Sequence, residues 1–349
     1  KTWMGSTKIG YWRPEIAVVT SPEGTANYRR SWEAIREADH VIEIGPSSGW
    51  LGGEIVFQGP VSKLLKADTL TGKYLRGDLF IEPPATRRKP TGTITLRKVE
   101  TNNLKDLDVT IPLGVMTCVT GVSGSGKSSL VSKILYPALK KLNGGFAGRT
   151  GKYVRLSGDT DRIQSLEFVD QNPIGRSSRS NPATYIKAFD DIRSLFADQK
   201  LAKVRNYKPG FFSFNVPGGR CEECEGEGVV KIEMQFMADI YLQCEHCRGT
   251  RFKDEVLEIR YNNKNISDIL ELTIDEAVRF FEEGEKVAAA VKRINSKLKP
   301  LQDVGLGYLR MGQSSSTLSG GEAQRIKLAY FLSRGGNEAP TLFIFDEPT

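Results

Sequence analysis

The chain has 349 residues, of which 39% are hydrophobic and 26% are charged, a balance typical of a globular protein with two or three cores. No stretch approaches the roughly 20 apolar residues of a membrane-spanning helix, and the N-terminus lacks an apolar signal region, so we expect a cytoplasmic protein with no membrane partner. The net charge of +7 permits nucleic-acid binding without establishing it. The first residue is not methionine, which is consistent with a start inside a longer protein.

The first part of the chain, residues 1–90, reads as the end of one module followed by a linker. Helical spacing covers Tyr28–Asp39, and two short apolar runs, Val41–Ile44 and Glu54–Phe57, flank a glycine-rich turn and predict a hairpin. A short helix and its tail are expected over 61–76. Three prolines and a basic run in 82–93 indicate the linker. Residues 1–30 carry several glycines and prolines with only one short apolar run, and no element is predicted before Tyr28.

The second part, residues 91–171, has the element order of a nucleotide-binding core. Strands are predicted at Gly92–Lys98 and Leu107–Ile111, and the apolar run Val115–Thr120 reads as a strand leading into a glycine-rich loop. A helix follows over Ser128–Lys141, and another strand over Ile163–Val169. Cys118, inside the apolar run, is expected to be a buried core thiol.

The remaining chain divides into an insert at 172–317 and a final segment at 318–349. In the insert, helical patterns appear near Tyr185–Phe196 and over Thr273–Glu283 and Lys286–Leu298, and alternation from Ile232 to Phe236 predicts a half-buried strand. The final segment contains a capped helix and an apolar run, Leu342–Phe345, that reads as a buried strand.

The loop Gly121–Ser129 matches a phosphate-binding loop. Its glycines let backbone N–H groups converge on phosphate oxygens, while Lys127 reaches the β- and γ-phosphates and the Ser128 hydroxyl ligates Mg²⁺. A flexible Gly/Ser turn is the alternative, and the strand–loop–helix context favours the phosphate loop. The predicted residues for ATP and Mg²⁺ are Gly121, Ser123, Gly124, Ser125, Gly126, Lys127, Ser128, Ser129 and Asp346.

Two further motifs complete an ATPase pattern. Asp346 and Glu347 follow an apolar strand, where phosphate-loop ATPases keep a Mg²⁺-organising aspartate, and Glu347 is placed to orient or deprotonate the attacking water. The sequence Leu318–Glu322 reads Leu-Ser-Gly-Gly-Glu, the signature of ABC-type ATPases, in which a capped helix start presents N–H groups to a γ-phosphate held by another domain. A merely structural capped helix is compatible with the same residues. The signature residues are Ser319, Gly320, Gly321 and Glu322.

Four cysteines follow the spacing C-x2-C-x19-C-x2-C, typical of a structural zinc site built from two knuckles. The predicted ligands are Cys221, Cys224, Cys244 and Cys247. A redox dithiol is the rival interpretation, but two matched pairs favour Zn²⁺ with a closed coordination shell and no metal catalysis.

Basic residues around the knuckles are compatible with a face for nucleic-acid phosphates, with Arg176, Arg179 and Lys208 as the candidate DNA contacts. Four glutamates lie in the same module, so a solvated surface of mixed charge is the alternative.

Together these residues resemble the UvrA family, the ABC-type ATPase of bacterial nucleotide excision repair, from about Ala38 to Thr349. Besides the motifs above, the resemblance is carried by 38–46 (ADHVIEIGP), 70–75 (LTGKYL), 103–106 (NLKD), 170–175 (DQNPIG), 179–185 (RSNPATY), 212–216 (FSFNV), 303–306 (DVGL) and 316–322 (STLSGGE).

The resemblance implies an α/β fold: an ABC-type P-loop nucleotide-binding domain with an inserted α+β signature domain that carries the four-cysteine zinc module. It implies that Gln171 is the Q-loop glutamine that senses the γ-phosphate, so that Gln171 and Glu347 are the catalytic candidates. The implied function is ATP-dependent recognition of damaged double-stranded DNA. The resemblance also implies a homodimer that works with a UvrB-type helicase as part of the excision nuclease, and a role in the SOS response.

Some features of the family pattern are not present. A first module's phosphate loop and signature are absent, and the sequence stops after Asp-Glu-Pro-Thr349, so we expect turnover in a full-length protein rather than in this chain alone. No aromatic residue in Lys98–Asp108 is available to stack on adenine. Two alternatives stay open: a UvrA-like ATPase serving drug or toxin resistance, and a zinc-organised DNA-binding module without turnover.

Overall fold

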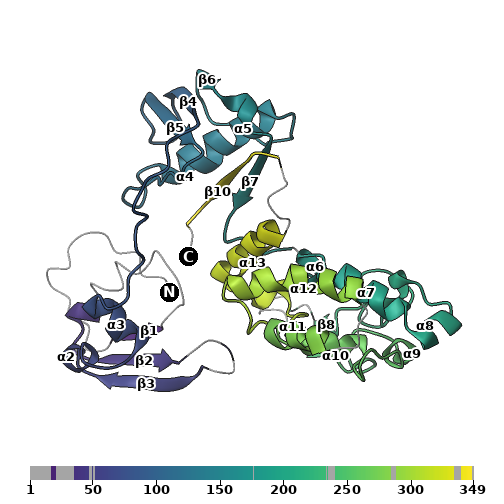
Figure 1. The fold of residues 1–349 in the computed structure, drawn as a ribbon. Coiled ribbons are helices and arrows are strands. Elements are labelled where there is room, and N and C mark those ends of the chain that lie inside the picture. Colours follow the sequence, from purple (N-terminus) through teal and green to yellow (C-terminus); the bar gives the residue numbers. More distant parts are fainter. Residues whose placement is uncertain are drawn as a thin grey trace. The chain divides into compact units, whose positions relative to one another are not determined.

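The computed structural model describes residues 17–20, 35–46, 49, 52–175, 177–232, 234, 240–283, 288–333 and 339–347. It divides into two compact units, one spanning residues 1–87 and the other 88–348 (Figure 1). None of the helices in the described ranges is long and apolar enough to cross a membrane.

The first unit is a small sheet with two short helices. Strand β1 (Ala17–Thr20) pairs in parallel with β2 (Val41–Gly45), and β2 pairs antiparallel with β3 (Glu54–Gly59), so the predicted hairpin is confirmed. Of the predicted helix at 28–39, residues 35–37 are helical and 28–34 lie outside the described residues.

The segment 61–76 forms two helices, α2 (Val61–Leu64) and α3 (Leu70–Arg76), where one helix and a tail were expected. Gly72 of α3 lies close to the end of α2, since a Cβ there would come within 2.7 Å of the Leu64 carbonyl oxygen. A glycine at this position therefore allows the second helix to pack against the end of the first. The small core contains Ile35, Val41, Leu64 and Leu75.

The second unit begins with an antiparallel sheet of strand order β5–β4–β6, formed by β4 (Gly92–Val99), β5 (Leu107–Leu113) and β6 (Arg155–Gly158). The first two strands were predicted and β6 was not. The helix after the glycine-rich loop is confirmed and runs through α4 (Lys127–Leu130), a π-helical turn (Val131–Leu135) and α5 (Tyr136–Leu142). Its apolar side packs on the sheet through Ile134, Leu135 and Leu139.

A separate parallel pair joins distant parts of the chain. Strand β7 (Ser165–Val169) pairs with β10 (Thr341–Phe345), in a register that sets Val169 beside Phe345. Because parallel neighbours end at the same edge, the residues that follow the two strands, starting at Asp170 and Asp346, lie together. The insert leaves after β7 and returns to β10.

Three expectations for this region differ from the structure. The run Val115–Thr120 forms no strand, and Met116 is 96% exposed, because the run has no hydrogen-bonded strand neighbour in the described part of the chain. Cys118 is consequently exposed instead of buried. Strand β10 is buried on one face only, at Ile344, while Phe343 and Phe345 are exposed, since the sheet it belongs to has two strands.

The insert is mainly helical and packs around one large apolar core. Its helices are α6 (Pro182–Tyr185), α7 (Ala188–Ala197), α8 (Lys200–Val204), α9 (Asp254–Leu257), α10 (Ile266–Glu271), α11 (Ile274–Glu283) and α12 (Ala288–Asp303), with 3₁₀ turns at Pro209–Phe212 and Ser315–Thr317. The predicted helices near 185–196, 273–283 and 286–298 are confirmed, except that 286 and 287 lie outside the described residues. Helix α13 (Gly320–Ser333), which starts in the signature, belongs to this same core through Ala323, Ile326 and Ala329.

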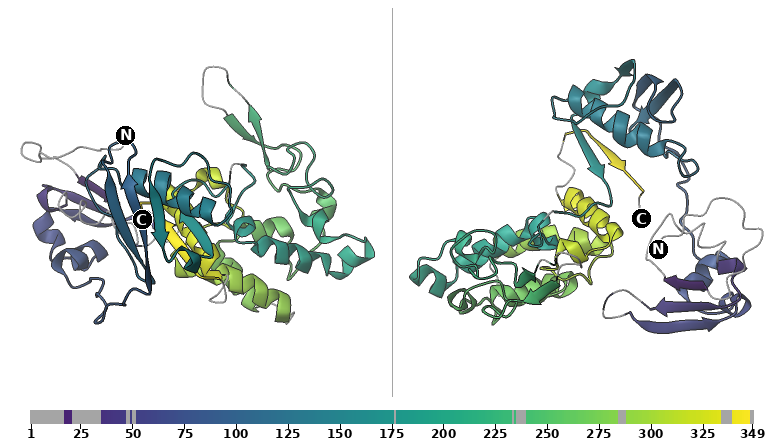
Figure 2. Two further views of the ribbon diagram at one scale, coloured as in Figure 1. Left: turned by 90° about the horizontal axis from the view of Figure 1, so that it is seen from above. Right: turned by 180° about the vertical axis from the view of Figure 1, so that it is seen from behind.

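A hairpin projects from the insert. Strands β8 (Val229–Ile232) and β9 (Ile240–Gln243) pair antiparallel, and Figure 2 shows them extending away from the helices. The strand predicted over Ile232–Phe236 therefore ends at Ile232 as far as the structure describes it, and Phe236 lies outside the described residues. Of the positions predicted to be half-buried, Ile232 is exposed and Met234 is half-buried, and Ile240 and Leu242 of β9 are exposed as well.

Candidate nucleotide and zinc sites

The loop Gly121–Ser129 has a backbone that three glycines make possible. Gly121, Gly124 and Gly126 have φ values of +151°, +79° and +104°, in the region that side chains with a Cβ rarely adopt. Gly126 is also the residue that starts α4, and a Cβ there would lie 2.6 Å from the Leu104 side chain. The loop is thus shaped to bring its backbone N–H groups to the start of a helix, as phosphate binding requires.

Lys127 folds back onto this loop. Its ammonium donates to the carbonyl oxygens of Gly121 (2.8 Å) and Val122 (2.9 Å). Ser123, Gly124, Ser125 and Ser128 are exposed or nearly so, whereas Ser129 is buried. The ammonium therefore already lies over the loop, where a phosphate would replace the two carbonyl partners.

Two asparagines that belong to none of the predicted motifs bind the glycine-rich loop through their side-chain amides. Asn102 Nδ2 donates to Ser129 Oγ (2.8 Å), and Asn103 Nδ2 donates to the Gly124 carbonyl oxygen (2.8 Å). Both come from the turn between β4 and β5. The signal that the sequence offered for these contacts was two adjacent amide side chains between the two strands predicted ahead of the loop.

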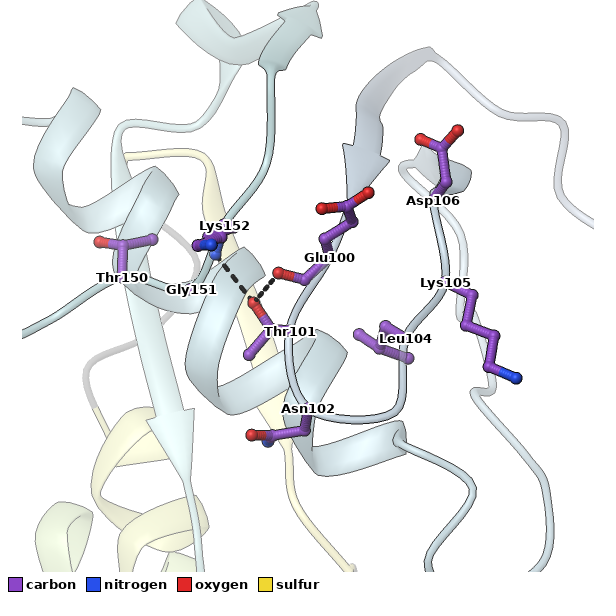
Figure 3. A pocket seen from close by; sticks show the side chains of 9 residues that line it. All are labelled: Glu100, Thr101, Asn102, Leu104, Lys105, Asp106, Thr150, Gly151 and Lys152. Carbon is purple, nitrogen blue, oxygen red and sulfur yellow. Dashed lines mark hydrogen bonds between the residues drawn. The ribbon is translucent and has the colours of Figure 1, made fainter.

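The same turn lines a cavity of about 670 Å³ (Figure 3). Thr101 Oγ accepts from the Lys152 backbone N–H (2.8 Å), which joins the turn to the segment before β6. Asn102 and Leu104 line the cavity and also lie against the loop, although no residue of the loop itself lines the cavity. The lining residues are Glu100, Thr101, Asn102, Leu104, Lys105, Asp106, Thr150, Gly151 and Lys152, none of them aromatic.

The ends of β7 and β10 bring the predicted catalytic residues together. Gln171 Nε2 donates to the Glu347 carbonyl oxygen at 2.8 Å. Asp346 Oδ2 lies 3.5 Å from Ser132 Oγ, one helical turn beyond Ser128, so the carboxylate faces the helix that follows the glycine-rich loop. Glu347 is exposed and has a positive φ of +49°.

The signature residues form the capped helix start that the sequence predicts. Ser319 Oγ accepts from the Glu322 N–H (3.3 Å), and Glu322 Oε2 accepts from the Ser319 N–H (2.7 Å), a reciprocal capping box. Tyr308 donates its hydroxyl to the same carboxylate, and burial together with this contact raises the pKa of Tyr308 to about 12.

Gly320 lies against the Q-loop of the same unit. A Cβ at Gly320 would meet Gln171 Oε1 at 3.0 Å and Gln171 Cβ at 3.1 Å. The signature and the glutamine are therefore in direct contact, and the small residue at 320 permits this approach.

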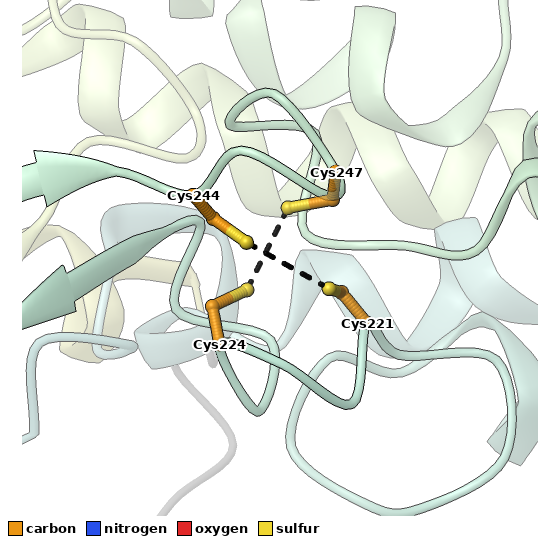
Figure 4. A group of neighbouring side chains, drawn as sticks. All are labelled: Cys221, Cys224, Cys244 and Cys247. Carbon is orange, nitrogen blue, oxygen red and sulfur yellow. Dashed lines mark hydrogen bonds between the residues drawn. The ribbon is translucent and has the colours of Figure 1, made fainter.

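The four cysteines of the two knuckles form one buried cluster (Figure 4). Their Sγ atoms all lie within 4.8 Å of one another, with Cys221 and Cys244 4.0 Å apart and Cys224 and Cys247 3.6 Å apart. The β8–β9 hairpin separates the knuckles in sequence and returns the second beside the first. Four convergent thiols are the donor set of a structural zinc site, and the cluster fits Zn²⁺.

The local backbone and the electrostatics agree with that assignment. Gly228 donates its N–H to Cys224 Sγ at 3.2 Å, and tight turns at Gly226 and Gly249 have φ of +82° and +84°. Without a cation, burial raises the pKa of the Cys224 thiol to about 12. A bound cation would favour the thiolate form of the four sulfurs, because metal binding releases their protons.

No protein-family model matches the chain. UvrABC system protein A of Clostridium perfringens is 50% identical over 319 residues, which cover 91% of this chain and 33% of that protein. The same protein of Aquifex aeolicus is 51% identical over 91% of this chain and 34% of its own length. The crystal structure of UvrA2 from Deinococcus radiodurans superposes with a TM-score of 0.81 at 50% identity, covering 91% of this chain and 37% of that chain.

The chain matches a part of a larger UvrA. It spans about a third of the length of the curated relatives it matches. The predicted fold class is confirmed, since the UvrA2 structure shares the fold and the four-cysteine cluster is present.

The structure gives the predicted DNA contacts of this UvrA-like chain little support. Arg176 lies outside the described residues, and Arg179 donates to the Glu225 carbonyl oxygen of the first knuckle (3.0 Å). Lys208 is exposed at the start of a 3₁₀ turn. Neighbouring basic residues are ion-paired, namely Arg205 with Glu258, Arg220 with Glu225 and Lys253 with Glu222. Mixed charge thus accounts for much of this surface, and a continuous basic face stays a prediction.

Proposed function

We propose that this chain is the nucleotide-binding and zinc-bearing part of a UvrA-type ATPase that recognises damaged duplex DNA in nucleotide excision repair. The observation that carries the proposal is the meeting of three motifs at one edge. Gln171 bonds to the Glu347 backbone and abuts Gly320 of the signature, and Asp346 faces the helix that follows the glycine-rich loop.

The residues of this edge divide the chemistry among them. Lys127 exchanges its two loop carbonyls for phosphate oxygens, a charge-assisted contact. Ser128 and Asp346 would hold Mg²⁺, which neutralises phosphate charge when bound. Glu347 orients the attacking water and accepts its proton. Gln171 senses the γ-phosphate and contacts the signature, so the position of the signature depends on the bound nucleotide.

The cavity beside the β4–β5 turn supplies the space for the nucleoside. Asn102 lines this cavity and donates to Ser129 of the loop, and the cavity walls carry backbone and polar groups with no aromatic ring. Recognition of the base here would rest on hydrogen bonds and edge contacts.

The zinc cluster has a structural role in this proposal. Four thiolates close the coordination shell, so the metal stabilises the knuckles and performs no catalysis. The module would lie beside the DNA path and contact phosphates without reading base edges, as recognition of distorted duplex requires. A homodimer and a UvrB-type helicase partner belong to the full-length protein.

Filter binding of damaged and undamaged duplex by this chain, with and without ATP, tests the proposal. A preference for damaged duplex that changes with ATP supports a repair function. ATP binding without any preference for damage favours a UvrA-like resistance ATPase, and duplex binding indifferent to ATP favours a zinc-organised binding module.

A further inference from the structure

One buried lysine in the signature helix touches the Q-loop on both sides of the sensing glutamine. Lys327 is 9% exposed, and its ammonium contacts the Asp170 carboxylate, the Asp170 carbonyl oxygen (3.0 Å) and the Asn172 carbonyl oxygen (2.8 Å). An ammonium has three donors, and here each finds an acceptor. The residues that provide them directly precede and follow Gln171.

The Q-loop is itself folded around this contact. The Asn172 N–H donates to Asp170 Oδ1 at 3.2 Å, and the Asn172 side chain bonds to the other oxygen. Burial alone raises the pKa of Asp170, but the hydrogen bond and charge of Lys327 outweigh it and lower the pKa below its usual value. The carboxylate is thus held ionised between the loop and the helix.

A second side chain of the same helix holds the strand ends. Gln324 Nε2 donates to the carbonyl oxygens of Val169 (3.2 Å) and Asp346 (2.9 Å). Residues three apart lie on one helix face, so Gln324 and Lys327 together fasten this face of α13 to the ends of β7 and β10. The start of α13 lies against Gln171 through Gly320.

We propose that Lys327 is a positioning residue that couples the Q-loop to the signature helix, so that a nucleotide-driven shift of Gln171 moves the signature. This rests on the proposed ATP binding and deepens it. A buried ammonium with three loop acceptors makes residues 170–172 and α13 move together, because separating them would leave a buried charge unpaired. The signature is then coupled to the nucleotide of its own unit.

Hydrogen exchange of this chain with and without ATP tests the coupling. In the wild type, ATP should change exchange both in the Q-loop (170–174) and at the signature (318–325), with ADP giving a smaller change. Lys327→Met should keep the effect at the glycine-rich loop but lose it at the signature. Couplings between linked sites are typically about 5–150-fold, so the ATP-to-ADP ratio of exchange rates at 318–325 should fall from that range towards one.

Two further variants separate coupling from folding. Asp170→Asn keeps the size and the backbone acceptors but removes the ion pair, so it should reduce the ATP effect at 318–325 even if Lys327→Met fails to fold. Lys299→Met is the matched control, because Lys299, on the neighbouring helix α12, forms an exposed ion pair with Glu282 of α11 (2.9 Å). It should behave as the wild type.

The outcomes are distinct. This inference is wrong if every variant binds ATP and both Lys327→Met and Asp170→Asn keep the wild-type response at 318–325. The proposed function would then still stand. Absence of ATP binding by the wild type overturns both.

Discussion

The zinc cluster allows the sharpest prediction, because little else holds its module together. Among the described residues, the buried core of the knuckles is the four cysteines, and both strands between them are exposed. Cys224→Ser replaces a buried thiolate ligand whose Sγ also accepts the Gly228 N–H. The described part of the knuckles has no apolar core to compensate for the lost ligand.

The magnitude follows from the position of the ligand. Loss of a group that merely supports a metal ligand costs about 10–100-fold in affinity, so loss of a direct thiolate should exceed about 100-fold, or about 2.7 kcal/mol. Apparent binding free energies of structural zinc are about 10–16 kcal/mol in small domains, so a weakened site still folds partly at high zinc.

Metal content, limited proteolysis and circular dichroism together measure this effect. The wild type should bind one zinc per chain, and Cys224→Ser should lose it on dialysis and become cleavable within 221–251. Helix content should be retained, because the insert's core is built from other residues, such as Phe189 and Phe212. Cys118→Ser is the matched control, since Cys118 is exposed and outside the cluster. Full zinc retention by Cys224→Ser, or equal loss in the control, would refute the four-thiolate site.

Four further outcomes are expected. Zinc affinity should fall with acidification from pH 8 to 6 in chelator competition, because burial raises the pKa of the Cys224 thiol to about 12 and each thiol must release its proton to bind zinc as a thiolate. A flat profile would contradict this. Lys127→Ala should weaken ATP binding by about 1.5–3 kcal/mol in calorimetry, and unchanged affinity would remove the phosphate-loop assignment. Gly126→Ala should lower the free energy of unfolding by about 1–3 kcal/mol through strain at its positive φ, whereas Gly148→Ala, whose Cβ meets open space, should not. Arg179→Ala and Lys208→Ala should each lower the salt slope of duplex binding by about one, and an unaltered slope would place the DNA elsewhere.

Sequence reasoning predicted best the features that depend on nearby residues. Knuckle spacing, the hairpin over 41–59 and the helix after the glycine-rich loop each follow from a short stretch of chain. For this reason the cysteine cluster and the capping box at Ser319 were predictable residue by residue, and the structure contains both.

The errors occurred where tertiary pairing decides. An apolar run such as Val115–Thr120 becomes a strand only beside a hydrogen-bonded neighbour, and the structure gives it none in the described part of the chain. The burial of Cys118 was predicted from that strand and failed with it. Asn102 and its partner Ser129 are 27 residues apart in sequence, and Lys327 and its partner Asp170 are 157 residues apart. A pattern in a short stretch of sequence cannot predict such contacts.

Helix α13 shows why the long-range contacts matter. Its residues Ala323, Ile326 and Ala329 are buried in the core of the insert, while Gln324 and Lys327 bind the ends of β7 and β10. Such a helix is attached to two parts of the molecule, to one through apolar packing and to the other through buried polar contacts. A displacement of one part is transmitted to the other, because separating the helix from either is costly. The insert leaves the core after β7, and α13 is the last described helix before β10. As part of the proposed coupling, we therefore expect a displacement of the insert to reach the ends of β7 and β10 along α13, through Lys327 as well as through the contact of Gly320 with Gln171.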